Sequence, residues 1–257
     1  MNWHDIIGLL STLALFAPVL IILIFRLLPY KNYQALFLYC FFAFVYNLMT
    51  ENIVHVPALF ARNYALVNNL LDVPTMLLFL LIFSTSKAQT TRMKLYLAAF
   101  VLFEIIVVSI YGLGFKSITI IIGPGLVLIF SLALYFFVSR VKQSFLHSKA
   151  IGKAIIASSI CFAYGCFAFI YIMHYILRLP DLPNIFMIYY IVTIVYCTQL
   201  SIGMVMESKR KRKLEELLVT RKELKRFFED EKKPVTSQEA TGRLNLSQGF
   251  NSNTSFR

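Results

Sequence analysis

The chain has 257 residues, of which 58% are hydrophobic and only 15% are charged, with a formal net charge of +12 and a mean hydropathy of +0.70. A soluble domain is roughly 45–50% apolar and about 25% charged, so the composition excludes an ordinary soluble protein. The 10 Gly and 4 Cys also exclude collagenous and disulfide-rich classes. A membrane-spanning helix needs about 20 apolar residues, so the chain is long enough for roughly seven spans and a tail.

Seven apolar runs separated by short polar breaks predict transmembrane helices. Barrel strands, the other structures that span a bilayer, would be shorter and would alternate in hydropathy. The expected fold class is therefore all-α, a polytopic membrane protein with a seven-helix bundle. The predicted spans are Ile6–Phe25, Ala35–Val54, Tyr64–Ser84, Leu95–Tyr111, Ser117–Val138, Ala154–Leu177 and Ile185–Met206.

Lysine and arginine are concentrated in alternate breaks between these runs. The breaks after the second, fourth and sixth runs hold only Arg62, Lys116 and Arg178. By the positive-inside rule, this asymmetry predicts an N-terminus outside and a C-terminus in the cytoplasm. The breaks after the first, third and fifth runs hold nine such residues: Arg26, Lys31, Lys87, Arg92, Lys94, Arg140, Lys142, Lys149 and Lys153.

The composition changes abruptly after the last apolar run, which divides the chain into three expected parts. Residues 1–206 form the transmembrane domain, 207–233 a basic amphipathic cytoplasmic helix, and 234–257 a disordered, Ser/Asn/Gln-rich tail. The helix begins with five cations that favour contact with anionic lipid of the inner leaflet. These residues are Lys209, Arg210, Lys211, Arg212 and Lys213.

Two further roles for this helix follow from its leucines, which recur at helical spacing. It could pair with itself through residues 207–231, or bind a separate cytoplasmic protein. The net charge is divided between the inner breaks and the tail and suits a membrane surface, so no nucleic-acid partner is expected.

Three carboxylates lie inside predicted spans: Glu51, Asp72 and Glu104. Ionisable groups in a bilayer are costly and normally face the bundle interior or a water-filled cavity. No Lys or Arg lies at matching depth in the spans. Hydrogen bonds, protonation or a water-filled pocket must therefore stabilise the carboxylates. Most intramembrane polarity falls in the expected outer half, where a receptor pocket would need it. The predicted ligand-binding residues are Asn47, Glu51, Asn68, Asp72, Glu104, Tyr171, His174 and Tyr189.

Two prolines fall within predicted spans beside polar or small residues. Pro74 follows Asp72 by two residues, and Pro124 lies between two glycines. Both are expected to interrupt their helices and free backbone carbonyls.

Several functional classes lack the residues they require. The seventh span has no lysine for a retinal Schiff base, and only four histidines are present, so no cofactor and no metal site are expected. The residues nearest to a metal site would be His55 and His174 beside Glu51 and Asp72. No nucleophile or phosphate-binding motif is found, so no catalytic residue is assigned.

One stretch carries a resemblance to known proteins. The run Asn68-Asn69-Leu-Leu-Asp-Val-Pro-Thr-Met-Leu-Leu-Phe-Leu-Leu-Ile-Phe, with Asn47 upstream, resembles a functionally unassigned set of small seven-helix membrane proteins from Bacteroidota. These proteins have a paired Asn and a polar residue ahead of an apolar run in the same span. The resemblance implies a bacterial inner membrane, and some members look like sensor input modules.

Three hypotheses for function remain open at this point. The first is a sensor or receptor-like protein that binds a small ligand in an outer polar cavity and signals through its cytoplasmic helix to a separate partner. The second is a small-molecule or ion-coupled transporter that uses Asp72 and Glu104. The third is an intramembrane enzyme that modifies lipid, with the carboxylates as acid and base.

Overall fold

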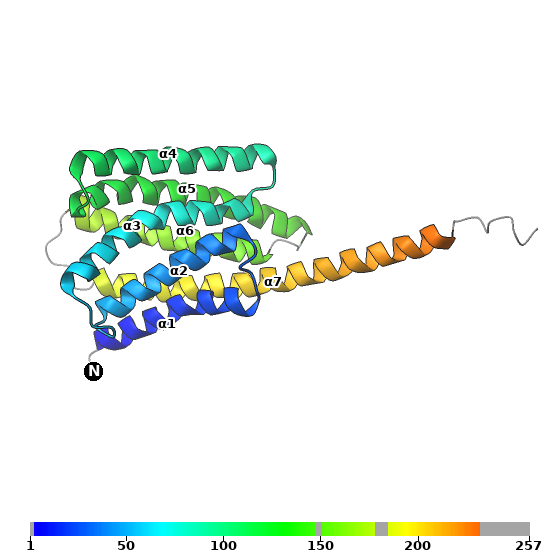
Figure 1. The fold of residues 1–257 in the computed structure, drawn as a ribbon, viewed down its shortest axis with the longest axis horizontal. Coiled ribbons are helices and arrows are strands. Elements are labelled where there is room, and N and C mark those ends of the chain that lie inside the picture. The colour runs from blue at the N-terminus through cyan, green and yellow to red at the C-terminus, as the bar shows by residue number, and fades with distance from the viewer. Residues whose placement is uncertain (1–2, 148–150, 178–184, 232–257) are drawn as a thin grey trace, which may run out of the picture. The chain divides into compact units, whose positions relative to one another are not determined.

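The computed structural model describes residues 3–147, 151–177 and 185–231. All elements in these ranges are helical, with no strand among them (Figure 1). The α-helices are α1 (Trp3–Ile24), α2 (Lys31–Thr50), α3 (Ala58–Leu80), α4 (Lys87–Tyr111), α5 (Phe115–His147), α6 (Ile151–Tyr171) and α7 (Ile185–Glu231). A 3₁₀ turn, η1 (Leu81–Phe83), follows α3, and a π-helical turn, η2 (Ile172–Ile176), follows α6.

Seven helices in the described ranges are long and apolar enough to cross a membrane. Their surface is also apolar: Leu102, Ile105 and Ile110 of α4 are 58%, 58% and 68% exposed. Such side chains would be costly in water but are suited to lipid. The prediction of an all-α, seven-helix integral membrane protein is confirmed.

The chain forms two compact units, Met1–Ser208 and Lys209–Arg257. The first contains α1 to α6 and the part of α7 that ends at Ser208. The described part of the second consists of the remaining helical turns of α7, which end at Glu231. The segment 234–257, expected to be disordered, lies outside the described residues, as do the basic residues Lys149 and Arg178.

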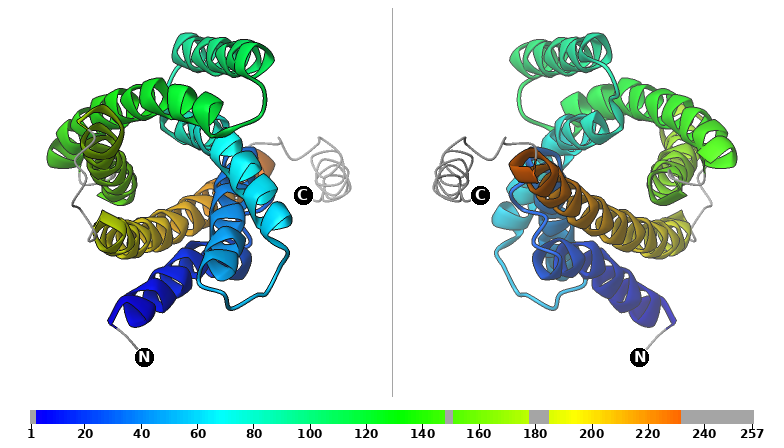
Figure 2. Two further views of the ribbon diagram at one scale, coloured as in Figure 1. Left: turned by 90° about the vertical axis from the view of Figure 1, so that its left-hand side faces the viewer. Right: turned by 90° about the vertical axis from the view of Figure 1, so that its right-hand side faces the viewer.

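Within the first unit, α3 occupies a central position. It packs against α2, α4 and α5, and a side-chain hydrogen bond joins it to α6. Viewed along the bundle, α4 lies outside α3 and α5 (Figure 2). We refer to the two ends of this unit as the Glu51 end, where α2 stops and α3 begins, and the Arg140 end, where α3 stops.

Several helices extend beyond the predicted spans at their polar ends, and α5 runs nine residues further, to His147 instead of Val138. α4 starts at Lys87, eight residues before the predicted Leu95, because the Ser86 hydroxyl caps it by accepting a hydrogen bond from the Gln89 N–H at 3.2 Å. α2 ends at Thr50, and Asn52 has a positive φ of 54° in the turn that follows. Hydropathy reports the apolar interior of a helix and misses such polar ends.

The expected interruptions at Pro74 and Pro124 are wrong, because α3 and α5 continue through them. A proline removes one backbone donor, yet neighbouring groups can re-satisfy the helix. In α3, the Thr75 hydroxyl next to Pro74 donates to the carbonyl oxygens of Leu71 at 2.6 Å and Asp72 at 3.1 Å, one turn before it. The Leu70 carbonyl is the one that lacks its helical N–H donor, because residue 74 is proline. Departures from α-geometry occur instead at η1, after α3, and at η2, after α6.

At the Arg140 end, cationic side chains cap the end of α3. Arg140 of α5 is only 6% exposed and donates to the Phe83 carbonyl oxygen, and Lys153 of α6 donates to the Ile82 carbonyl oxygen at 3.2 Å. The last carbonyls of a helix lack intrahelical partners and carry partial negative charge. These two residues, predicted only as loop charges, therefore fix α5 and α6 to the end of α3.

α6 and α7 cross closely at the same end. A Cβ atom on Gly152 would lie 2.9 Å from the Glu207 backbone nitrogen and 3.1 Å from the Gly203 carbonyl oxygen. The approach therefore requires glycine at this position, as in other small-residue contacts between membrane helices. Glu207, which the sequence places at the start of the tail, is fully buried here.

Candidate functional site

One of two hydrogen bonds between a tyrosine and a carboxylate that join distant helices in the described residues involves Asp72. The Tyr164 hydroxyl of α6 donates to the Asp72 Oδ1 of α3 at 2.7 Å, and Tyr164 is 1% exposed. A hydrogen bond to an ionised carboxylate contributes about 1.5–3 kcal/mol, more than most single contacts. Asp72 thus points into the bundle and links α3 to α6.

Tyrosines from two other helices surround this pair. The Tyr39 hydroxyl of α2 lies beside that of Tyr164, and Tyr189 and Tyr196 of α7 lie close enough to Asp72 to interact electrostatically. The Tyr196 hydroxyl is buried without a hydrogen-bond partner among the described residues. We call Asp72 with Tyr39, Tyr164, Tyr189 and Tyr196 the Asp72 cluster. It joins α2, α3, α6 and α7.

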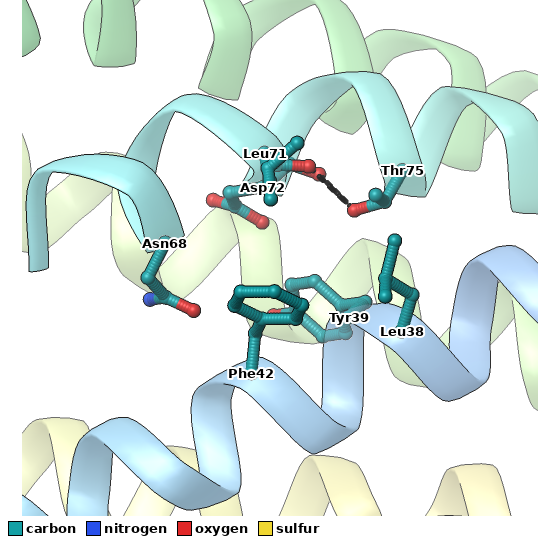
Figure 3. Close-up of a pocket in the computed structure, with 7 residues that line it drawn as sticks. All are labelled: Leu38, Tyr39, Phe42, Asn68, Leu71, Asp72 and Thr75. Carbon is teal, nitrogen blue, oxygen red and sulfur yellow. Dashed lines mark hydrogen bonds between the residues drawn. The ribbon is translucent and has the colours of Figure 1, made fainter. Parts of the chain in front are cut away.

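A small cavity lies between α2 and α3 beside the carboxylate (Figure 3). Its volume of about 10 Å³ is close to the minimum needed by one water molecule. Figure 3 shows the Asp72 carboxylate directed toward Asn68, Phe42 and Tyr39. The lining residues are Leu38, Tyr39, Phe42, Asn68, Leu71, Asp72 and Thr75.

Glu104 approaches the cluster from α4. Its side chain is 8% exposed, and its Oε1 is buried without a hydrogen-bond partner among the described residues. It interacts electrostatically with Asp72. A buried acidic side chain therefore lies near a partly buried one on the neighbouring helix, although α4 lies at the edge of the bundle.

Glu51 belongs to a separate polar contact at the Glu51 end. The Tyr190 hydroxyl of α7 donates to Glu51 Oε1 at 2.6 Å. The carboxylate lies against Gly8 of α1, where a Cβ atom would be 2.5 Å from Glu51 Cδ. Asn47, one turn earlier in α2, is 4% exposed, and its Nδ2 has no partner in the described part of the chain. This contact joins α1, α2 and α7.

The glycine at position 8 gives a test of this contact. Tyr190→Phe should lower the unfolding free energy of the wild-type protein by about 1.5–3 kcal/mol, because the carboxylate loses its hydrogen bond. In a Gly8→Ala background the added methyl displaces the Glu51 side chain, so the same substitution should have little further effect. Thermal unfolding of the four proteins in nanodiscs measures this coupling.

Gly114→Ala is the control background, because a Cβ atom there would meet nothing within 4 Å. If Tyr190→Phe costs the same in the Gly8→Ala and Gly114→Ala backgrounds, the packing of Glu51 on Gly8 does not support the hydrogen bond.

The remaining predicted site residues fall into two groups. Asn68 lines the cavity and Tyr189 lies near Asp72. Tyr171 instead donates to the Thr119 carbonyl oxygen at 2.9 Å, tying α6 to α5, and His174 lies in η2, exposed and edge-on to the Tyr175 ring. The structure therefore brings Asn68, Asp72, Glu104 and Tyr189 together, but not Tyr171 or His174.

Three tyrosines of the cluster are absent from the predicted ligand-binding residues: Tyr39, Tyr164 and Tyr196. The sequence does indicate that Tyr164 and Asp72 lie at a similar depth in their helices. Asp72 lies eleven residues before Phe83, and Tyr164 lies eleven residues after Lys153. Since α3 and α6 run in opposite directions, equal distances from the same end place both at one level. The adjacency of the two helices, however, is a tertiary feature.

The described residues contain no group of three or more His, Cys, Asp or Glu side chains that could hold a metal ion. Of the five cations predicted to contact lipid, Lys211 is partly buried and the other four are exposed. The exposed ones are Lys209, Arg210, Arg212 and Lys213.

Comparisons with protein-family models, curated proteins and solved structures gave no match. The fold and the Asp72 cluster therefore define the protein at the level of a seven-helix integral membrane protein, and function is argued from the site.

Proposed function

We propose that the protein is a seven-helix, receptor-like membrane sensor in which the Asp72 cluster receives the signal and α7 transmits it. The observation that carries the proposal is the hydrogen bond between Tyr164 and Asp72. A carboxylate held by a single hydroxyl between helices responds to any ligand or proton that competes for it. A change there alters a contact between α3 and α6.

Two further contacts favour α7 as the output. Tyr190 ties α7 to Glu51 of α2, and Gly203 packs α7 on Gly152 of α6. α7 then continues as one helix to Glu231. A shift of α6 therefore acts on a helix whose last turns belong to the second compact unit.

We further propose that the Glu51 end faces outside and the Arg140 end faces the cytoplasm of a bacterium, in the inner membrane. The asymmetry of Lys and Arg between alternate loops supports this orientation, and the resemblance to Bacteroidota proteins supports the membrane. Residues 209–213 then lie near anionic lipid of the inner leaflet. The helix 207–231 presents exposed leucines, including Leu214 and Leu217, to a cytoplasmic partner or to a second copy.

The orientation predicts the labelling of single cysteines in intact cells. A Phe250→Cys variant should react with a membrane-impermeant maleimide only after the membrane is permeabilised. Asn63→Cys, in the loop-proximal part of α3 at the Glu51 end, should react before permeabilisation because Asn63 is exposed. Labelling of position 250 in intact cells would show that the orientation is the opposite of the proposed one.

An ion-coupled transporter is the second candidate, and Glu104 is the observation that favours it. A buried carboxylate oxygen without a partner, close to a second acidic residue, is typical of proton- and cation-binding sites in transport proteins. Such a protein would move solute through the bundle, whereas a sensor would not.

Limited trypsin digestion in nanodiscs tests the sensor proposal. The cleavage rate at Lys209–Lys213 should change with the ion or solute that occupies the Asp72 cluster, and Asp72→Asn should abolish the change. Flux measurements in proteoliposomes loaded with the same ion or solute test the transporter candidate. Transport by the wild-type protein that is lost in Glu104→Gln, together with an unchanged cleavage rate of the tail, would favour transport over sensing.

A further inference from the structure

The cavity beside Asp72 is lined on one side by oxygen-bearing side chains of a single helix face. Asn68, Asp72 and Thr75 follow one another at intervals of four and three residues in α3, which places them on the same face. Tyr39 of α2 adds a hydroxyl from the facing helix. Residues that carry an amide, a carboxylate and two hydroxyls therefore line a space the size of one water molecule, together with the apolar side chains of Leu38, Phe42 and Leu71.

The charge of Asp72 has no cationic counterpart at its level in the described ranges. Tyr164 is a neutral donor that engages only Oδ1. The basic side chains directed into the unit from the Arg140 end, Arg140 and Lys153, bond to the carbonyls of Phe83 and Ile82. These two carbonyls lie in η1, eleven and ten residues after Asp72, which corresponds to roughly 15 Å of helix. An ionised carboxylate that is partly buried in an apolar bundle is unfavourable without a counter-charge.

The size and the donors of the cavity restrict the ligand. About 10 Å³ is too small for an organic molecule. Hard oxygen donors suit hard cations, and a single carboxylate neutralises one positive charge, whereas Ca²⁺ or Mg²⁺ would leave a net charge in the bilayer.

We propose that this cavity binds an alkali-metal cation, sodium or potassium, through Asp72, Asn68, Thr75 and Tyr39. The ion supplies the counter-charge that the described residues do not offer at the level of Asp72. Its role as the input of the sensor rests on the proposed function, but its binding does not, and binding is measured without reference to the tail.

The test is the thermal unfolding of the full chain in nanodiscs of neutral lipid at fixed pH and ionic strength. NaCl or KCl in place of choline chloride should raise the melting temperature saturably by about 3 °C or more. Comparison of the two salts identifies the preferred ion. The rise should vanish in Asp72→Asn and persist in the control Glu51→Gln, whose carboxylate contacts Gly8 and Tyr190 instead.

Equilibrium dialysis with ²²Na⁺ or ⁸⁶Rb⁺ should show one ion bound per wild-type chain. If Asp72→Asn fails to fold, Asn68→Ala and Thr75→Val should each weaken binding at least fivefold, while Asn63→Ala should leave it unchanged. Equal melting temperatures in sodium, potassium and choline, or a response that persists in Asp72→Asn, would overturn the proposal. A stability that depends on pH but not on either ion would show that a proton neutralises the carboxylate.

If the ion binds and the tail shows no response to it, the cation site stands and the sensor proposal fails. If the tail responds through Asp72 to another stimulus and no ion binds, the sensor proposal stands and the cation site fails.

Discussion

Substitution of Gly152 by alanine is expected to destabilise the bundle by about 1–3 kcal/mol, the range found for overpacked interiors. The new methyl would meet the Glu207 nitrogen at 2.9 Å and the Gly203 carbonyl oxygen at 3.1 Å. These are backbone atoms of α7, so no side-chain rotation relieves the contact and the two helices must separate. Alanine also favours helix over glycine by up to about 1 kcal/mol, which offsets part of the loss.

Gly165→Ala is the matched control in the same helix. Its Cβ atom would lie 3.0 Å from the ring of Phe130, a side chain that can rotate, so helix propensity should offset most of the cost. Thermal unfolding in nanodiscs compares the two variants. Equal stabilities would show that the crossing of α6 and α7 is not close enough to require glycine.

Tyr164→Phe is expected to lower the unfolding free energy by about 1.5–3 kcal/mol, because it removes the hydroxyl that donates to Asp72 Oδ1 while keeping the ring. Asp72→Asn retains the shape of the side chain and its capacity to hydrogen-bond, so it should keep the fold at a smaller cost. In the Asp72→Asn background, Tyr164→Phe should cost about 1 kcal/mol, since a neutral acceptor forms a weaker bond.

The double-mutant cycle on Asp72 and Tyr164 isolates this interaction from the general effect of each substitution. Tyr175→Phe is the control, because Tyr175 is exposed in η2 and packs against His174. A coupling energy near zero would mean that the pair contributes no more than its packing.

The membrane-spanning segments were predictable because apolar length is a strong signal. Their polar ends were not: α4 begins at Lys87 because Ser86 caps it, and capping residues also occur in loops. The effect of the two prolines on their helices was likewise not predictable from the sequence. Pro74 removes a backbone donor, but the sequence does not show that the helix continues around it.

The candidate site was predictable in part. Asp72 was identified because a carboxylate deep in a span without a cation at its level requires a partner or a pocket. The partner, Tyr164, lies 92 residues away, and only the packing of α3 against α6 brings it near. Arg140 and Glu207 were predicted as loop and tail charges, because hydropathy does not distinguish a buried charge at a helix end from a solvated one.

The sensor proposal depends on whether a change at Asp72 reaches the tail. A spin label at Leu218→Cys, which is half exposed in the tail helix, reports this in nanodiscs when the four native cysteines are replaced. Asp72→Asn should alter the mobility of the label relative to wild type, and the exposed control Asn63→Ala should not. Identical spectra for all three proteins, each shown to be folded, would contradict coupling between the Asp72 cluster and α7.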